Sequence, residues 1–184
     1  MDQLTIHLAE GFEEVEAITI IDVLRRAGLN IVIVSLTHAH LVTGAHQIKI
    51  MADLLFEEVD YKMGSMIILP GGMPGAKNLD EHLGLRSQIL DYHNKGKYLA
   101  AICAAPLVFG NLGILKGRRA VCYPGFEAYL KGAAIGNEPF IKDDTIITGR
   151  GIGAALEFSL EIVRVLSGEE KATKLRKEML VDKN

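Results

Sequence analysis

Short apolar runs alternate with amphipathic segments along this chain of 184 residues, and that alternation limits the folds it can adopt. Uninterrupted apolar runs such as 30–36 and 65–70 are typical of strands buried on both faces. Segments 13–28 and 153–168 have helical apolar spacing, and each ends at a glycine. Repeated strand–helix–strand order predicts a parallel sheet between helices. We therefore expect a single α/β domain over residues 1–184, with a flavodoxin-like, doubly wound, mostly parallel sheet.

The same pattern predicts where the individual elements lie. Strands are expected at 4–9, 30–36, 65–70, 97–103, 118–124 and 145–149, and helices at 13–28, 83–96, 104–115, 153–168 and 169–180. A glycine between two short extended runs predicts a small hairpin or excursion at 41–50. In the first helix, apolar residues recur in steps of three and are expected to share one face: Val15, Ile18, Ile21 and Leu24.

Composition and charge exclude several classes of protein. The formal net charge is −3, with no basic stripe suited to nucleic acid. No apolar run reaches the roughly 18 residues that a membrane span needs, and the first residues lack a signal-peptide pattern. Two cysteines are too few for a disulfide framework. We therefore expect a cytoplasmic protein whose thiols are reduced, with no nucleic-acid or membrane partner.

One of the two cysteines, Cys103, falls where an apolar strand meets a helix start in "AAICAAP". Ligands of such folds bind beyond the carboxyl ends of the strands, so this turn is a candidate site. A thiol at a sharp strand-to-helix turn is pushed out of the sheet, and a helix N-terminus lowers its pKa. Alternatively, Cys103 is a small buried hydrophobe, because free cysteine is among the most buried residue types.

Two further strand-end turns contribute candidate groups. Gly71 and Gly72 in "LPGGMPG" could aim backbone N–H groups at an oxyanion, or could simply reverse the chain. Glu13 and Glu14 are expected to be solvated at the start of a helix. Glu16 faces the sheet, and a carboxyl group beside a thiolate would share one proton with it as a coupled pair.

Five segments together carry a resemblance to a known family: "AEGFEEVEA", "DVLRRAG", "LPGG", "AICAAP" and "GRGIGAALEF". In this order and spacing the chain resembles the ThiJ/PfpI superfamily over about residues 4–180. It is most similar to the branch of the parkinsonism-associated protein deglycase and its small bacterial relatives. The resemblance implies a flavodoxin-like homodimer that needs no cofactor or metal.

The resemblance also assigns roles to residues of the site. It makes Cys103 the reactive cysteine, Glu16 its paired carboxyl, and the backbone of Gly71, Gly72 and Ala104 the surrounding amides. His46 matches a basic residue that reaches the site from the partner chain, so it is either a base acting in trans or a histidine in a surface loop. Tyr123 stands where related proteins often carry a histidine, and a phenol is a poor base at neutral pH.

Two more residues are expected near the carboxyl ends of the strands, and their roles are less specific. Cys122 could resolve an oxidised Cys103 into a disulfide, although a buried strand position is the favoured interpretation. Arg150 is expected to anchor a structural ion pair near a helix start.

Three functions compete for these residues. The first is a cysteine-dependent enzyme that acts on small reactive aldehydes or glycated substrates, of the glyoxalase or deglycase type. The second is a redox-responsive stress protein or chaperone that senses oxidation of Cys103. The third, a peptidase or amidase, is disfavoured because Ala104, and not histidine, follows the cysteine.

Overall fold

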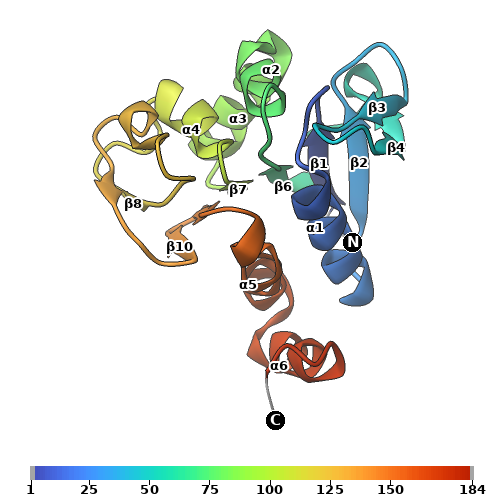
Figure 1. The fold of residues 1–184 in the computed structure, drawn as a ribbon, viewed down its shortest axis with the longest axis vertical. Helices are drawn as coiled ribbons and strands as arrows, with labels where there is room; N and C mark the ends of the chain where they lie inside the picture. The colour runs from blue at the N-terminus through green and yellow to red at the C-terminus, as the bar shows by residue number, and fades with distance from the viewer. Residues whose placement is uncertain (1–2, 183–184) are drawn as a thin grey trace.

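The computed structural model describes residues 3–182, and its centre is one mostly parallel sheet (Figure 1). The sheet contains β1 (Gln3–Leu8), β2 (Ile31–Ser35), β5 (Leu54–Leu55), β6 (Gly64–Leu69), β7 (Tyr98–Ile102), β10 (Phe140–Asp143) and β11 (Ile146–Gly149). Their order across the sheet is β10-β11-β7-β6-β1-β2-β5. Every neighbouring pair is parallel except β10 and β11.

Helices cover both faces of this sheet, which confirms the predicted doubly wound α/β fold. The helices are α1 (Glu14–Arg26), α2 (Gly75–Glu81), α3 (Leu83–Asn94), α4 (Pro106–Asn111), α5 (Ala155–Ser167) and α6 (Glu169–Glu178). Residues of α1, α5 and α6 form the core on one face, and residues of α2, α3 and α4 form the core on the other. None of the helices within residues 3–182 combines the length and apolar character needed to span a lipid bilayer.

The apolar runs are uninterrupted because each central strand contributes to both cores. In β6, Met66 and Ile68 point to the face of α1 and α5, while Ile67 and Leu69 point to the face of α2 and α3. Successive side chains of a strand alternate between faces, so a strand covered twice needs apolar residues at every position. All four of these side chains are completely buried.

Two of the shorter extended segments predicted from the sequence agree with the structure to different degrees. The predicted hairpin exists as β3 (Leu41–Thr43) paired antiparallel with β4 (Lys49–Met51). The predicted strand 118–124 is confirmed only in part, because β8 covers just Arg119–Ala120. This strand pairs with β9 (Ala134–Ile135) and lies outside the main sheet. The N–H of Val121 donates to the Thr148 hydroxyl at 3.0 Å, which ends the ladder before Cys122.

The predicted buried face of α1 is also partly wrong. Val15 and Ile18 are 50% and 46% exposed, whereas Ile20 and Leu24 are completely buried. An α-helix turns by about 100° per residue, so each step of three residues falls about 60° short of a full turn. Over the nine residues from Val15 to Leu24 the drift reaches half a turn. The apolar series therefore winds around the helix and leaves two of its members on the outside.

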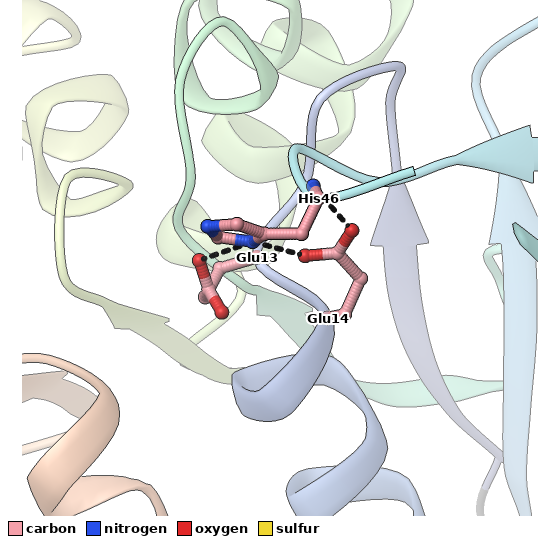
Figure 2. A group of neighbouring side chains, drawn as sticks. All are labelled: Glu13, Glu14 and His46. Atoms are coloured by element: carbon pink, nitrogen blue, oxygen red, sulfur yellow. Dashed lines mark hydrogen bonds and ion pairs between the residues drawn. The ribbon is translucent and has the colours of Figure 1, made fainter. Parts of the chain in front are cut away.

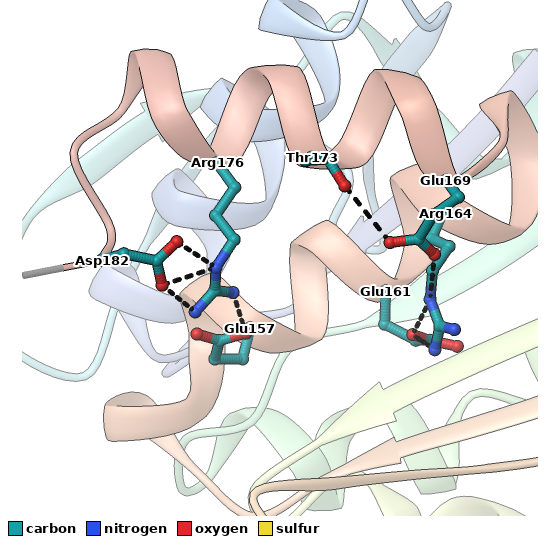
Figure 3. Close-up of polar contacts among 7 residues, drawn as sticks. All are labelled: Glu157, Glu161, Arg164, Glu169, Thr173, Arg176 and Asp182. Carbon is teal, nitrogen blue, oxygen red and sulfur yellow. Dashed lines mark hydrogen bonds and ion pairs between the residues drawn. The ribbon is translucent and has the colours of Figure 1, made fainter.

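Ion pairs attach the last helix to α5 (Figure 3). Arg176 of α6 donates to Glu157 of α5 at 2.6 Å and also pairs with Asp182 at 2.8 Å. At the other end of the contact, Arg164 bonds Glu161 within α5 and lies 3.7 Å from Glu169 of α6. These contacts surround an apolar seam formed by Ala172 and Leu175.

The sheet order reverses between β1 and β6, which makes the carboxyl ends of these strands the expected ligand-binding edge. The loops that follow the two strands are bonded to each other. The Glu13 N–H donates to the Gly71 carbonyl at 2.8 Å, and the Gly75 N–H donates to the Gly11 carbonyl at 3.1 Å. The start of α1 is therefore fixed relative to the glycine-rich turn.

We expect Gly75→Ala to destabilise the protein because the two loops touch there. A Cβ at this position would lie 2.6 Å from the Gly11 carbonyl oxygen and 2.7 Å from the Phe12 Cα, both backbone atoms. Overpacking of this kind costs about 1 to 3 kcal/mol, measurable as a lower free energy of unfolding in urea. Gly153→Ala is the control, since nothing lies within 4 Å of its added Cβ. Equal stability of the two variants would contradict this account of the loop contact.

Candidate active site

Cys103 occupies the bend between β7 and α4 in a strained conformation. Its φ is +64°, a left-handed value that residues with a side chain rarely adopt. Two backbone hydrogen bonds hold it there: its N–H donates to the Gly149 carbonyl at 2.9 Å, and its carbonyl accepts from the Tyr123 N–H at 2.8 Å. Strain that the surroundings enforce in this way is typical of functional sites. Cys103 as a residue is partly exposed and packs against both cores of the sheet.

The side chain of Glu16, in α1, lies next to the Cys103 thiol, and both lie against Gly71. The Glu16 side chain is completely buried, and its Oε2 accepts the Gly71 N–H at 2.8 Å. The thiol and this carboxyl group both lie against Gly71, and the charge of the carboxylate acts on the thiol. A Cβ at Gly71 would lie 3.0 Å from the Cys103 Sγ and 2.8 Å from the Glu16 Oε2. Glycine is therefore required at position 71. Because its N–H already donates to the Glu16 carboxyl group, it is not free to bind an oxyanion.

The thiol and the carboxyl group change each other's acidity. Burial raises the pKa of Glu16 to about 7, against the hydrogen bonds from Gly71 and Cys103. Burial, and then the charge of Glu16, raise the pKa of the Cys103 thiol to about 12. This direction is opposite to the expected lowering of the thiol pKa by a helix N-terminus. Because the two groups are buried side by side, they titrate as a coupled pair.

Two backbone amides oppose this rise in the pKa of the Cys103 thiol. They belong to Gly72 and Ala104, and both lower the pKa of the Cys103 thiol. Gly72 has a φ of +92°, so glycine allows its amide to turn toward the site. Negative charge that develops at sulfur, or on an atom bonded to it, would meet these two donors.

His46 lies at the start of α1, against carboxylates of its own chain (Figure 2). Its Nδ1 lies 2.8 Å from the Glu14 Oε2 and 3.6 Å from the Glu13 Oε2, and its backbone N–H donates to the Glu14 Oε1 at 2.6 Å. The bond to Glu14 and the two negative charges raise the pKa of His46. A histidine whose pKa is raised is less often in the neutral form that can accept a proton at neutral pH. Its role across a dimer stays a prediction.

The expectation that Glu14 is solvated is wrong, because the β3–β4 hairpin covers it. The Glu14 side chain is 1% exposed. The hairpin approaches this closely at Gly44, where a Cβ would lie 2.3 Å from the carboxyl group. No spacing pattern predicts this contact, which joins residues 32 positions apart.

Within residues 3–182, only Glu13, Glu14 and His46 bring three potential metal ligands within 4.8 Å of one another. A cation among them would face the N-terminus of α1, whose dipole disfavours positive charge. Glu14 already accepts backbone N–H groups of the hairpin and pairs with His46. We therefore assign these residues to the fixing of the hairpin and not to a metal.

The remaining candidate residues lie on the other side of Cys103. The predicted ion pair of Arg150 is wrong: its guanidinium donates to the Asn137 carbonyl at 3.2 Å and pairs with no carboxylate of residues 3–182. Arg150 and the half-exposed Tyr123 line a pocket of about 320 Å³. Cys122 is 4% exposed, and burial raises the pKa of its thiol to about 11. Neither cysteine is in a disulfide.

We expect Glu16→Gln to stabilise the protein at high pH but not at low pH. The pKa of Glu16 rises from 4.5 to about 7 on folding, so the wild type loses stability as pH increases across this range. One pKa unit is worth about 1.4 kcal/mol, which gives a cost of about 3 kcal/mol once Glu16 is ionised. Glutamine, which is never ionised, avoids this cost. Urea unfolding at about pH 5 and about pH 8.5 tests the difference, and a gain that is the same at both would contradict a raised pKa.

Comparison with known proteins identifies the family. The model of the DJ-1/PfpI family matches residues 3–165. Protein DJ-1 homolog B of Arabidopsis thaliana is 38% identical over 94% of this chain, which spans only 40% of that relative's length. A Caenorhabditis elegans relative named glutathione-independent glyoxalase DJR-1.2 is 32% identical over 95% of this chain and 93% of its own length.

A solved structure supports the same assignment. The crystal structure of Drosophila melanogaster DJ-1beta matches with a TM-score of 0.94 and 32% identity, over 99% of each chain. The agreement covers the whole sheet and the helices on both faces. This chain therefore belongs to the DJ-1/PfpI family.

Proposed function

We propose that the protein is a cysteine-dependent enzyme that converts a small 2-oxoaldehyde, such as methylglyoxal, to the corresponding 2-hydroxy acid without a cofactor. The observation that carries the proposal is the contact of the Cys103 thiol with a carboxyl group whose pKa is about 7. A general base is most effective when its pKa is close to the working pH. The name of the C. elegans relative agrees with this reaction class.

In the first step Cys103 attacks the aldehyde. The Glu16 carboxylate takes the thiol proton as the bond between sulfur and the aldehyde carbon forms. The amides of Gly72 and Ala104 stabilise the negative charge, and Glu16 then gives the proton to the new alkoxide. The product of this step is a hemithioacetal, and the enzyme has recovered an ionised Glu16.

The second step moves hydrogen between two carbons of the substrate. Glu16 removes the proton of the former aldehyde carbon, and a proton is delivered to the neighbouring carbonyl carbon through an enediol. The aldehyde carbon is thereby oxidised to a thioester and its neighbour is reduced to an alcohol, so no external oxidant is needed. Water then cleaves the thioester, which releases the hydroxy acid and restores the thiol.

We expect the purified protein to consume methylglyoxal in buffer free of other thiols, and Cys103→Ser to lower kcat/KM by at least about 100-fold. Because Glu16 must be ionised to accept the thiol proton, kcat/KM of the wild type should rise as pH increases through about 7 and then level off. Initial rates between about pH 5.5 and 8.5 measure both effects.

Each outcome of this assay has a distinct meaning. Cys122→Ser is the matched control and should retain activity, since this thiol lies outside the contact with Glu16. A rate that does not change with pH would remove Glu16 as the base. Equal inactivity of the wild type and Cys103→Ser would favour the alternative of a redox-responsive stress protein, in which Cys103 is oxidised and does not turn over substrate.

We also propose that the protein forms a homodimer through the outer face of α1. The exposed Val15 and Ile18 continue into a hollow of about 370 Å³ lined by Ile152, Leu156 and Met179. Contiguous apolar surface of this kind is typical of an interface. The cytoplasmic location, action on glycated substrates and independence of cofactors stay predictions alongside it.

The dimer is tested by placing a charge on this face. We expect Ile18→Glu to convert a dimer to a monomer, measured as molar mass by light scattering after gel filtration, because a charge buried without a partner destabilises an interface. Leu83→Glu is the matched control, since Leu83 is 80% exposed at the start of α3. A wild type that is monomeric at micromolar concentration would contradict the proposal.

A further inference from the structure

A pocket of about 320 Å³ lies next to the backbone segments that hold Cys103. Its walls include Tyr123, Pro124, Pro139 and Arg150. The proposed reaction at Cys103 does not use any of these side chains.

The backbone places this pocket next to the reactive thiol. Cys103 is bonded through its N–H to Gly149 and through its carbonyl to Tyr123. Tyr123 is itself in the pocket wall, and Arg150 directly follows Gly149. The Tyr123 ring passes close to the backbone of Gly151, where a Cβ would lie 3.3 Å from it. Both segments that hold the Cys103 backbone therefore also contribute residues to the pocket wall.

The size of the pocket exceeds what methylglyoxal needs. Methylglyoxal has only five non-hydrogen atoms, whereas cavities of about 300 Å³ and more are those that hold drug-sized ligands. Most of the wall is apolar, from Tyr123 and the two prolines. An aromatic ring stacks favourably against such surfaces, and Tyr123 adds the face of its own ring.

The polar part of the pocket is cationic. The Arg150 guanidinium uses one N–H for the Asn137 carbonyl at 3.2 Å, and no carboxylate of the described residues 3–182 forms an ion pair with it. A guanidinium has five N–H donors in a planar fork that matches a carboxylate. The neighbouring Glu138 bonds Arg119 instead. Arg150 therefore keeps donors and an unbalanced positive charge for a ligand.

We propose that this pocket binds the substituent of the substrate, and that the preferred substrates are 2-oxoaldehydes carrying an aromatic ring with a carboxylate at its far end. The ring contacts Tyr123 and the carboxylate bonds Arg150, while the aldehyde lies at Cys103. The inference rests on the proposed function and names its substrate class.

Initial rates on three compounds test this preference: methylglyoxal, phenylglyoxal and 4-carboxyphenylglyoxal. We expect kcat/KM to increase in that order for the wild type. Tyr123→Ala should lower the ratio of the aryl compounds to methylglyoxal about tenfold. Arg150→Ala should lower the ratio of the carboxylated to the plain aryl compound by a similar factor, and Arg150→Lys should restore part of it.

Two controls accompany this comparison of kcat/KM ratios. Lys171→Ala removes an exposed positive charge on α6 and should leave all three ratios unchanged. Arylglyoxals also modify arginine, so the intact mass of each protein is checked after the assay. Ratios that are the same in the wild type, Tyr123→Ala and Arg150→Ala would overturn the inference.

A binding measurement separates this inference from the proposed reaction. Mandelate and 4-carboxymandelate are the hydroxy acids expected from the two aryl compounds, and their affinities are measured by calorimetry with lactate as the reference. Tighter binding of 4-carboxymandelate that is lost in Arg150→Ala supports the pocket even if no aldehyde is turned over. Turnover of methylglyoxal with equal affinity for all three acids would overturn the pocket and leave the reaction standing.

Discussion

The contact of a thiol and a carboxyl group beneath one glycine is the constraint on which the rest of the site depends. Cys103 and Glu16 come from segments far apart in the chain, a strand-end bend and the first turn of α1, and they meet only because Gly71 has no side chain. The same glycine donates its amide to Glu16 and accepts the N–H of Glu13. A single backbone turn therefore sets the position of Cys103 and Glu16 relative to each other.

Burial, more than the helix dipole, determines the chemistry of this pair. A helix N-terminus would favour a thiolate, but burial and the charge of Glu16 raise the pKa of the Cys103 thiol. A buried carboxyl group with a pKa of about 7 is then available to accept that proton. The arrangement resembles general base catalysis more than attack by a preformed thiolate.

The sequence predicted the elements that depend on local pattern and missed those that depend on contacts distant in the chain. Uninterrupted apolar runs identified the central strands because each strand fills two cores. The exposure of Val15 could have been derived from helical geometry, since steps of three residues drift around α1. The burial of Glu14 beneath the hairpin could not, because it arises from a contact across 32 residues. For the same reason, the carbonyl partner of Arg150 was not predictable.

The division of the site into two halves has a physical origin in the sheet. On the side of α1, the loops after β1 and β6 are bonded to each other through backbone atoms and close-packed glycines, which leaves little room for a different side chain. On the side of β11, Tyr123 and Arg150 project from segments whose backbone holds Cys103 while their side chains are exposed. Substitutions there can change the pocket without moving the thiol. The fold thus fixes Cys103 and Glu16 in place and leaves the side chains of the neighbouring pocket free to vary.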